Sequence, residues 1–211
     1  MKNILIINAS PRGERSNSRR LTALFGQQLV ENNKDCSVCH REVGQEAIPH
    51  ISEAWIAAAF KPAQLRDDDD HLALSMSDML ISELKNADVI VLGSPMYNWS
   101  IPSALKAYLD QVIRVNETIQ ISTDDPENPY IGLLKNKKVY LLLSRGNGGY
   151  SSGEYYAHMN FQSQYLKTVF NIMGITDVTE IALNGEAFGG DAFADSMKSV
   201  HSQIEQAALL N

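Results

Sequence analysis

Residues 4–18 read Ile4-Leu-Ile-Ile7 and then Asn8-Ala-Ser-Pro-Arg-Gly-Glu-Arg-Ser-Asn-Ser18, an apolar run followed by a polar segment. Four consecutive apolar residues are typical of a strand that is buried on both faces, as in a parallel sheet. A helical pattern of apolar residues starts just after Ser18, at Leu21 and Leu24. A strand, a polar loop and a helix in this order form the repeating unit of α/β proteins.

The same unit recurs along the chain. Further apolar runs lie at Val89–Leu92, Val139–Leu143 and Val178–Leu183, and we expect a weaker strand near Ser37–Val43. Helical periodicity separates these runs. We therefore predict a single α/β domain over residues 1–211, with a doubly wound, five-stranded parallel sheet and helices on both of its faces.

Two stretches interrupt this alternation. Residues 44–71 contain two prolines and the acidic run Asp67–Asp70, and we expect a surface excursion there. Residues 122–132 contain two prolines and three acids, and we expect an exposed loop. Asp67–Asp70 could bind a divalent cation, but no spaced calcium-loop pattern surrounds the run, which favours a solvated acidic loop.

The overall charge limits the partners of the chain. There are 18 Lys and Arg residues against 25 Asp and Glu residues, a net charge of −7, which disfavours nucleic acid and anionic lipid surfaces as partners. No apolar run approaches the roughly 18 residues that span a bilayer. The two cysteines cannot build a disulfide scaffold. We expect a cytoplasmic protein with no membrane segment.

Ligands of open α/β sheets bind at the carboxyl ends of the strands, so the loops there deserve most weight. After the first strand, hydroxyls, an amide and the N–H groups of a helix start predict an anion pocket formed by Ser10, Ser16, Asn17 and Ser18. Four arginines and one acid between Ser10 and Arg20 add a local charge of +3. The alternative is that these residues only cap the helix. Neither a Walker loop nor G-x-G-x-x-G is present.

Two further loops complete the predicted binding edge. The loop at Pro95–Trp99 contains Met96, Tyr97 and Trp99, which could contact a flat ligand or pack under neighbouring loops. The loop at Ser144–Gly153 contains four glycines, which would expose backbone N–H groups to a ligand unless the loop is simply mobile. A phosphate pocket, aromatic side chains and bare backbone fit a phosphate tail on a planar polar ring, as in FMN.

Four segments resemble, in order, the FMN-dependent NADH:azoreductase and NAD(P)H:quinone reductase family of flavodoxin-like fold: Ser10 to Ser18, Pro95-Met-Tyr-Asn-Trp99, Ser144-Arg145-Gly146 and Gly174-Ile-Thr-Asp177. The resemblance covers nearly the whole chain. It implies tightly bound FMN, NADH as electron donor, and a homodimer with flavin sites at the interface. The residues expected to contact FMN are Ser10, Ser16, Asn17, Ser18, Pro95, Met96, Tyr97, Asn98, Trp99, Ser144, Arg145, Gly146 and Gly148.

The reaction implied is a two-electron reduction of planar quinones and azo compounds by NADH, with ping-pong kinetics. The flavin carries the chemistry, and no side chain acts as a nucleophile. The N–H groups of residues 97–98 and 145–148 are expected to stabilise negative charge on the reduced ring. Arg145 is either a charged helper beside the ring or a surface arginine over a strand end. The physiological acceptor and the choice between NADH and NADPH stay open.

Three features depart from the family pattern. Trp99 stands where Phe is usual, and the glycine loop reads Arg-Gly-Asn-Gly-Gly rather than Arg-Gly-Gly. Asn184-Gly-Glu186 stands where we expect Glu-Gly-Ile. We expect these differences to affect the acceptor more than the cofactor.

Two other functions compete with the reductase hypothesis. A flavodoxin-like electron-transfer protein would hold FMN in the same way, but a stronger acidic field for docking is expected of it. The sequence Gly149-Tyr-Ser151-Ser-Gly153 matches G-x-S-x-G. Asp177 or Asp191, followed by His201, would complete the chain order Ser, Asp, His of the catalytic triad in α/β-hydrolases. However, Ser151 lies eight residues beyond the expected strand, and His201 lies in an amphipathic helix.

The sequence Cys36-Ser-Val-Cys39-His40 matches the C-x-x-C-H pattern of haem attachment and of redox disulfides. In a strand, Cys39 and His40 point to opposite faces. We therefore expect these residues to belong to an edge strand.

Overall fold

The computed structural model describes residues 1–210. Its main sheet has five parallel strands in the order β2-β1-β3-β6-β7, which confirms the predicted doubly wound sheet. This is the order 2-1-3-4-5 of flavodoxin-like proteins when only the strands of this sheet are counted. The strands are β1 (Lys2–Asn8), β2 (Cys36–Arg41), β3 (Val89–Pro95), β6 (Lys138–Ser144) and β7 (Asp177–Leu183).

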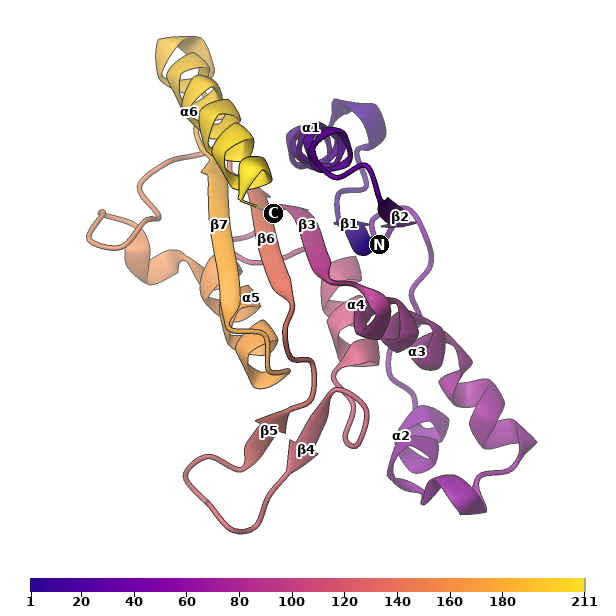
Figure 1. Cartoon of the computed structure of the whole chain (residues 1–211). Coiled ribbons are helices and arrows are strands. Elements are labelled where there is room, and N and C mark those ends of the chain that lie inside the picture. Colours follow the sequence, from indigo (N-terminus) through magenta and orange to yellow (C-terminus); the bar gives the residue numbers. More distant parts are fainter. Residues whose placement is uncertain (211) are drawn as a thin grey trace.

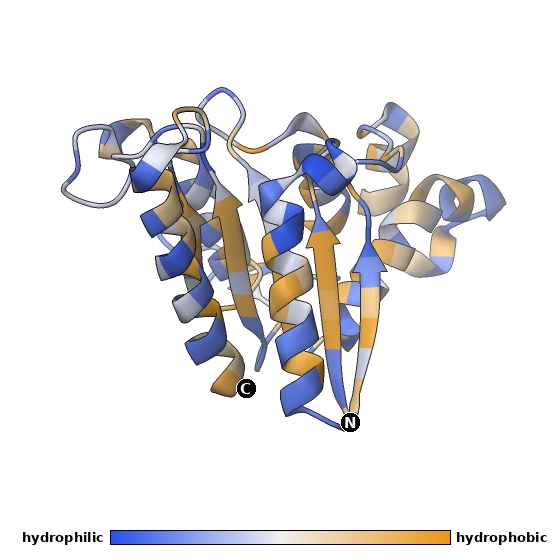
Figure 2. Ribbon diagram, turned by 90° about the horizontal axis from the view of Figure 1, so that it is seen from above, coloured by the Kyte–Doolittle hydropathy of each residue, from blue (hydrophilic) through white to orange (hydrophobic). Residues whose placement is uncertain are grey.

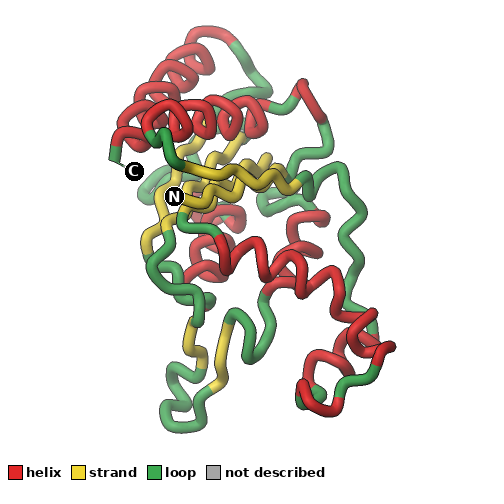
Figure 3. The backbone as a smooth tube through the Cα atoms, turned by 45° about the vertical axis from the view of Figure 1, so that its right-hand side comes forward, coloured by secondary structure: helices red, strands yellow, loops and turns green. Residues whose placement is uncertain are grey.

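Helices cover both faces of the sheet, as predicted (Figures 1 and 3). On one face lie α1 (Asn17–Asn32) and α6 (Gly190–Leu209), and on the other lie α3 (Asp68–Asn86), α4 (Ser103–Val112) and α5 (Phe161–Ile172).

Successive side chains of a strand point to opposite faces, so each buried strand feeds two cores. In β1, Ile4 and Ile6 pack in the core beneath α1 and α6, whereas Leu5 and Ile7 pack in the core beneath α3, α4 and α5. Figure 2 shows the result as apolar strands between helices whose outer faces are polar. This burial on both faces explains why the strands read as continuous apolar runs.

The excursion at residues 44–71 is more ordered than we expected. It contains the helix α2 (Glu53–Phe60), a short 3-10 turn (Ala63–Leu65) and the first residues of α3. A small satellite core of Trp55, Ala58, Ala59 and Leu74 fixes α2 against α3. The indole N–H of Trp55 also donates to Gln111 Oε1 at 2.9 Å, which ties α2 to α4.

The acidic run Asp67–Asp70 is the start of α3, so the prediction of a loop there is wrong, although Asp67, Asp68 and Asp69 are exposed as expected. Asp67 and Asp70 form a capping box, because each carboxylate accepts the backbone N–H of the other at 3.0 Å. Lys61 pairs with both carboxylates. Acids in the first turn also suit the positive end of the helix dipole. Among residues 1–210, no cluster of His, Cys, Asp and Glu could hold a metal ion.

The stretch at residues 122–132 is not loop throughout. Its last three residues form β5 (Tyr130–Gly132), which pairs antiparallel with β4 (Ile119–Ile121). The backbone of Gly132 lies so close to Gly174 that an added Cβ would come within 2.1 Å of Gly174 N. This contact holds the hairpin against the end of α5.

Cys36 and Cys39 lie on the edge strand β2, as predicted, and both are free thiols. Cys36 packs beside the core under α1 and α6, and Cys39 is exposed. The helices within residues 1–210 include none that is long and apolar enough to cross a bilayer.

Gly93 in β3 lets α1 lie close to the sheet. A Cβ at this position would come within 2.5 Å of Thr22 Cγ2 and 3.0 Å of Ser18 O. We expect Gly93→Ala to lower the free energy of unfolding by about 1–3 kcal/mol through overpacking, measured by urea denaturation. The second change Thr22→Ser removes Cγ2 but keeps the hydroxyl that donates to Asn8 Oδ1 at 2.7 Å, and should restore part of the loss. Equal stability of Gly93→Ala and wild type would contradict the close packing.

Candidate functional site

The three polar loops meet at one edge of the sheet. They follow β1, β3 and β6, which are neighbours in the sheet and run parallel. Backbone hydrogen bonds continue between the loops beyond the strands, from Ala9 N to Gly93 O at 2.9 Å and from Met96 N to Ser144 O at 2.8 Å. The predicted binding edge is therefore a continuous surface.

The loop after β1 places three serine hydroxyls around the start of α1. Ser10, Ser16 and Ser18 are 1%, 3% and 0% exposed. Ser16 is the N-cap, because its Oγ accepts the N–H of Arg19 at 3.3 Å, and it lies 3.1 Å from Ser18 Oγ. The N–H groups of Asn17 and Ser18 have no hydrogen-bond partner within residues 1–210. Capping and anion binding are thus compatible here, since the cap uses one N–H and leaves two available.

The local charge of +3 that we expected in this loop is largely offset by carboxylates distant in the sequence. Arg12 pairs with Glu186 at 2.9 Å, and Arg19 pairs with Glu42. Arg19 also donates to the carbonyl of Ser10 at 3.2 Å. The preference of the loop for an anion therefore depends on its hydroxyls, its free N–H groups and the helix dipole.

The loop after β3 is a tight turn that exposes its aromatic side chains. Tyr97 and Ser100 exchange two backbone hydrogen bonds of 3.0 Å, with Asn98 and Trp99 at positive φ of 48° and 65° between them. Positive φ at Trp is unusual and is typical of strain at functional sites. Tyr97 is 36% exposed and Trp99 is 48% exposed, so these rings do not pack under neighbouring loops.

Three of the N–H groups expected to face a ligand are already used. Tyr97 N donates to Ser100 O at 3.0 Å, and Arg145 N donates to Leu183 O at 2.9 Å. Gly148 N is occupied by the side chain of Asn147, at 2.8 Å. The N–H groups of Asn98, Gly146 and Asn147 keep no partner in the described part of the chain.

The segment after β7 lies against the loop after β6, at a distance where a Cβ on the glycines of this loop would make ordinary van der Waals contact. A Cβ on Gly146 would come within 3.4 Å of Ala187 Cβ. A Cβ on Gly148 would come within 3.8 Å of Asn184 Cβ. Ala187 N also donates to Gly146 O at 2.9 Å, so residues 184–187 support this loop from behind.

Arg145 is neither a surface arginine nor a charged group free to help a ligand. Its side chain is 1% exposed and turns into the protein. Nη2 lies 2.7 Å from Glu180 Oε1 and 3.3 Å from Ser163 Oγ, and Nε donates to Gln162 Oε1 at 3.1 Å. Both earlier interpretations of this side chain are therefore corrected. A planar guanidinium with its donors engaged is a structural group of the loop.

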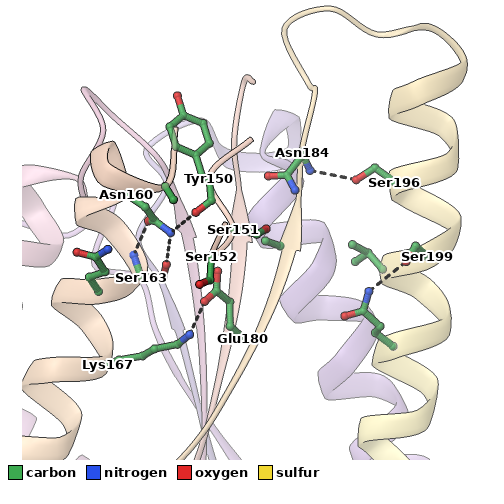
Figure 4. A pocket seen from close by; sticks show the side chains of 15 residues that line it. Tyr150, Ser151, Ser152, Asn160, Ser163, Lys167, Glu180, Asn184, Ser196 and Ser199 are labelled. Carbon is green, nitrogen blue, oxygen red and sulfur yellow. Dashed lines mark hydrogen bonds and ion pairs between the residues drawn. The ribbon is translucent and has the colours of Figure 1, made fainter. Parts of the chain in front are cut away.

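A polar cavity of about 740 Å³ lies on the far side of the third loop, between α5, β7 and α6 (Figure 4). It is lined by Tyr150 and Ser151 from the loop, Lys167 and Glu180, and Ser196 and Ser199 of α6. Glu180 pairs with Lys167 at 2.6 Å as well as with Arg145. This cavity borders the third loop only, so it is separate from the edge where the three loops meet.

The serine-hydrolase arrangement is absent from residues 1–210. Ser151 lines the cavity beside β7, whereas Asp177 begins β7 at the opposite end of the strand. His201 lies in another groove, beside Leu21 and Met197. The match to G-x-S-x-G is therefore coincidental.

Several residues at the start of α5 were missed from the sequence. Asn160 is the N-cap of α5, since its Oδ1 accepts Ser163 N at 3.1 Å. Its place before the amphipathic run that starts at Phe161 is an N-cap signal that could have located it. Gln162 is fully buried, but a lone glutamine carries no such signal.

Comparison with known proteins agrees with this architecture. The family model described as flavodoxin-like fold matches residues 2–208. The chain is 38% identical over 205 residues to the FMN-dependent NAD(P)H:quinone oxidoreductase 1 of Pseudomonas aeruginosa, covering 97% of both chains. It is 42% identical over 203 residues to the FMN-dependent NADH:quinone oxidoreductase 1 of Trichormus variabilis, covering 96% of this chain and 94% of the other.

Solved structures share the fold. An azoreductase from Bacillus anthracis superposes with a TM-score of 0.88 at 22% identity, covering 100% of both chains. An FMN-dependent NADH-azoreductase from the same species, in complex with FMN, gives a TM-score of 0.85 at 22% identity and covers 98% of both chains. The protein is thus of the flavodoxin-like class. Within this class, the chain belongs to the family of FMN-dependent NADH:quinone oxidoreductases.

Glu180 should make stability depend on pH. Burial alone would raise the pKa of this carboxyl, but the hydrogen bonds and charges of Lys167 and Arg145 outweigh burial and hold the pKa below its usual range. The stabilisation is therefore present above the unfolded-state pKa of about 4.3 and is lost as the pH falls through the lower folded-state pKa.

We expect Glu180→Gln to lower the free energy of unfolding at pH 7 by about 3 kcal/mol, because Arg145 stays buried without its counter-charge. Between pH 5 and pH 3 the variant should lose less stability than wild type does, because glutamine does not titrate. Urea denaturation over this pH range measures both effects, with Glu205→Gln, an exposed change on α6, as control. Parallel profiles of Glu180→Gln and wild type would contradict the assignment.

Proposed function

We propose that the protein is an FMN-dependent oxidoreductase that transfers two electrons from NADH to planar acceptors, quinones and azo compounds. The observation that carries this proposal is the cluster of buried hydroxyls and free N–H groups at the start of α1, next to the exposed rings of Tyr97 and Trp99. Relatives that match this chain over nearly its whole length are named for FMN, NADH and quinone, which supports the same chemistry here.

The donors at the start of α1 fit the phosphate of FMN. Ser10, Ser16 and Ser18 would donate through their hydroxyls, and Asn17 and Ser18 through their backbone N–H groups. The two N–H groups form part of the positive end of the α1 dipole, where a phosphate is stabilised. The carboxylates nearby, Glu42 and Glu186, are neutralised by arginines and do not oppose an anion.

The other two loops fit the ring of the cofactor. Met96, Tyr97 and Trp99 offer apolar surface, with Pro95 and Ser144 at the strand ends beneath them. The N–H groups of Asn98 and Gly146 are available to donate to polar ring atoms, and Gly148 keeps the loop free of a side chain there. Bound FMN would supply the two-electron chemistry, which no side chain of the chain provides.

The protein groups that act during the reaction are binding and orienting groups. Tyr97 and Trp99 are exposed at this edge and would orient NADH and then the acceptor beside bound FMN in turn, which predicts ping-pong kinetics. The N–H groups of Asn98 and Gly146 would stabilise negative charge by preorganised hydrogen bonding. The turn that holds Trp99 fixes the shape of the acceptor site.

We also propose a homodimer with the flavin sites at its interface. Apolar side chains around the candidate site are exposed, namely Trp99 (48%), Phe161 (56%), Phe188 (77%) and Tyr155 (82%). Exposed apolar patches of this kind often mark protein contacts. Light scattering should give twice the mass of one chain, with one FMN per chain, and a monomer that retains FMN would contradict the interface site.

The cytoplasmic location stays a prediction.

The reductase proposal is tested by one spectroscopic experiment. The protein is reconstituted with FMN, freed of excess, and treated without oxygen first with NADH and then with a quinone. We expect NADH to bleach the flavin band and the quinone to restore it. Retained FMN that NADH cannot bleach would favour the electron-transfer protein, and failure to retain FMN would contradict both functions.

The phosphate assignment is tested by Ser18→Ala. Loss of one buried hydroxyl that donates to a phosphate should raise the FMN dissociation constant about tenfold, measured by fluorescence titration, while circular dichroism shows an intact fold. Ser199→Ala, in the separate cavity beside β7, is the control and should leave the constant unchanged. A raised dissociation constant for Ser199→Ala, together with an unchanged one for Ser18→Ala, would place FMN in that cavity.

A further inference from the structure

We propose that a buried polar cluster at the start of α5 positions the second and third loops of the site relative to each other. The cluster consists of Arg145, Asn160, Gln162, Ser163 and Glu180, and we call it the α5 cluster. None of these residues except Arg145 was expected to matter from the sequence, and none needs to touch the cofactor or the substrate through its side chain. The inference rests on the proposed function, because the second and third loops form the proposed site for the flavin ring.

Gln162 joins the two loops with a single amide group. Its side chain is fully buried. Its Nε2 donates to Ser94 O at 3.2 Å, at the end of β3, and its Oε1 accepts from Arg145 Nε at 3.1 Å, at the end of β6. Because donor and acceptor are both used, the amide fixes the start of the second loop to the start of the third.

Arg145 extends the link from Gln162 to the neighbouring Ser163 and to β7. Its planar guanidinium reaches Ser163 Oγ at 3.3 Å and Glu180 Oε1 at 2.7 Å while keeping its bond to Gln162. A lysine ammonium could not hold three partners in this geometry. Burying an ion pair seldom adds stability compared with apolar packing, so a buried arginine at this point suits a positioning role better than a stabilising one.

The helix start also holds the end of the second loop and the middle of the third. Asn160 Nδ2 donates to Tyr150 O of the third loop at 3.0 Å and to Ser163 Oγ at 2.6 Å, as Figure 4 shows. Phe161 N donates to Trp99 O of the second loop at 3.1 Å. Residues 160–163 therefore bind both ends of the second loop, and the beginning and the middle of the third. A turn with positive φ at Trp99 persists only where its surroundings fix it, and this hydrogen bond is part of that restraint.

The chain contains a matched control for this cluster. Arg114 is 3% exposed and donates to Ser77 Oγ at 2.8 Å, and it also pairs with Asp78 and with Glu117. Like Arg145, it is a buried arginine with a hydroxyl and a carboxylate as partners. Its partners belong to α3 and to the segment after α4, and not to the three loops.

The test compares Arg145→Lys, Gln162→Glu and Arg114→Lys in the full chain. Gln162→Glu keeps an acceptor for Arg145 but loses the donor to Ser94 O, so it separates the two links. Three quantities are measured: the FMN dissociation constant, the melting temperature, and amide hydrogen exchange of residues 94–99 and 144–150 in protein freed of FMN. Hydrogen exchange reports local opening independently of the cofactor.

We expect Arg145→Lys and Gln162→Glu to raise the FMN dissociation constant about tenfold, the effect of one lost buried hydrogen bond to a positioning group. Exchange should accelerate mainly in residues 144–150 for Arg145→Lys and mainly in residues 94–99 for Gln162→Glu. Arg114→Lys should lower the melting temperature by a similar amount but leave the dissociation constant and the exchange of both loops unchanged.

An effect of Arg114→Lys on FMN as large as that of Arg145→Lys would overturn the proposal, because general destabilisation would then explain it. Unchanged exchange in both loops of Gln162→Glu would also overturn it, and this variant decides the question if Arg145→Lys does not fold. Failure of the wild-type protein to bind FMN would refute the proposed function instead, while exchange without FMN would still test the cluster.

Discussion

Parallel hydrogen bonding among β1, β3 and β6 sends the loops after these strands to the same edge of the sheet. The positions of the helices and of the three loops follow from that pairing. A parallel strand needs a crossover to return, and the crossovers are the helices that bury both faces of the sheet. The backbone bond from Met96 N to Ser144 O extends the pairing past the strands and brings the second and third loops into contact. Gly93 then lets α1 lie close enough to present its first turn at the same edge.

Under the proposed function, the start of α1 would hold an anion mainly with dipoles, because two arginines of the loop are paired with carboxylates. Arg12 and Arg19 are engaged with Glu186 and Glu42, so the first loop offers hydroxyls and N–H groups to a ligand. Such donors are fixed by the fold and need little rearrangement when a ligand binds. Below them, the third loop is held by a buried charge, Arg145, whose counter-charge comes from β7. Neutral groups contact the proposed ligand, and charged groups hold those neutral groups in place.

The sheet could be predicted because burial on both faces leaves continuous apolar runs, as at Ile4–Ile7 and Val89–Leu92. The N-cap at Ser16 also carries a local signal. The direction of the Arg145 side chain could not be predicted, because its partner Glu180 lies 35 residues away and is reached only through the pairing of β6 with β7. The same holds for Arg12 and Glu186, 174 residues apart. The helix at Glu53–Phe60 was missed because its apolar residues, Ala-Trp-Ile-Ala-Ala-Ala-Phe, show no helical period.

The turn at Asn98 and Trp99 makes the protein less stable than the same fold could be. Two-residue turns of this kind favour Asn-Gly, because glycine adopts positive φ without steric cost. A tryptophan at φ 65° stores about 1–3 kcal/mol of backbone strain that glycine would release. Engineering for heat resistance would therefore select glycine at this position and remove the ring from the edge of the sheet. If Trp99 shapes the acceptor site as proposed, stability and acceptor range depend on the same residue, and selection for stability alone would also change the acceptor range.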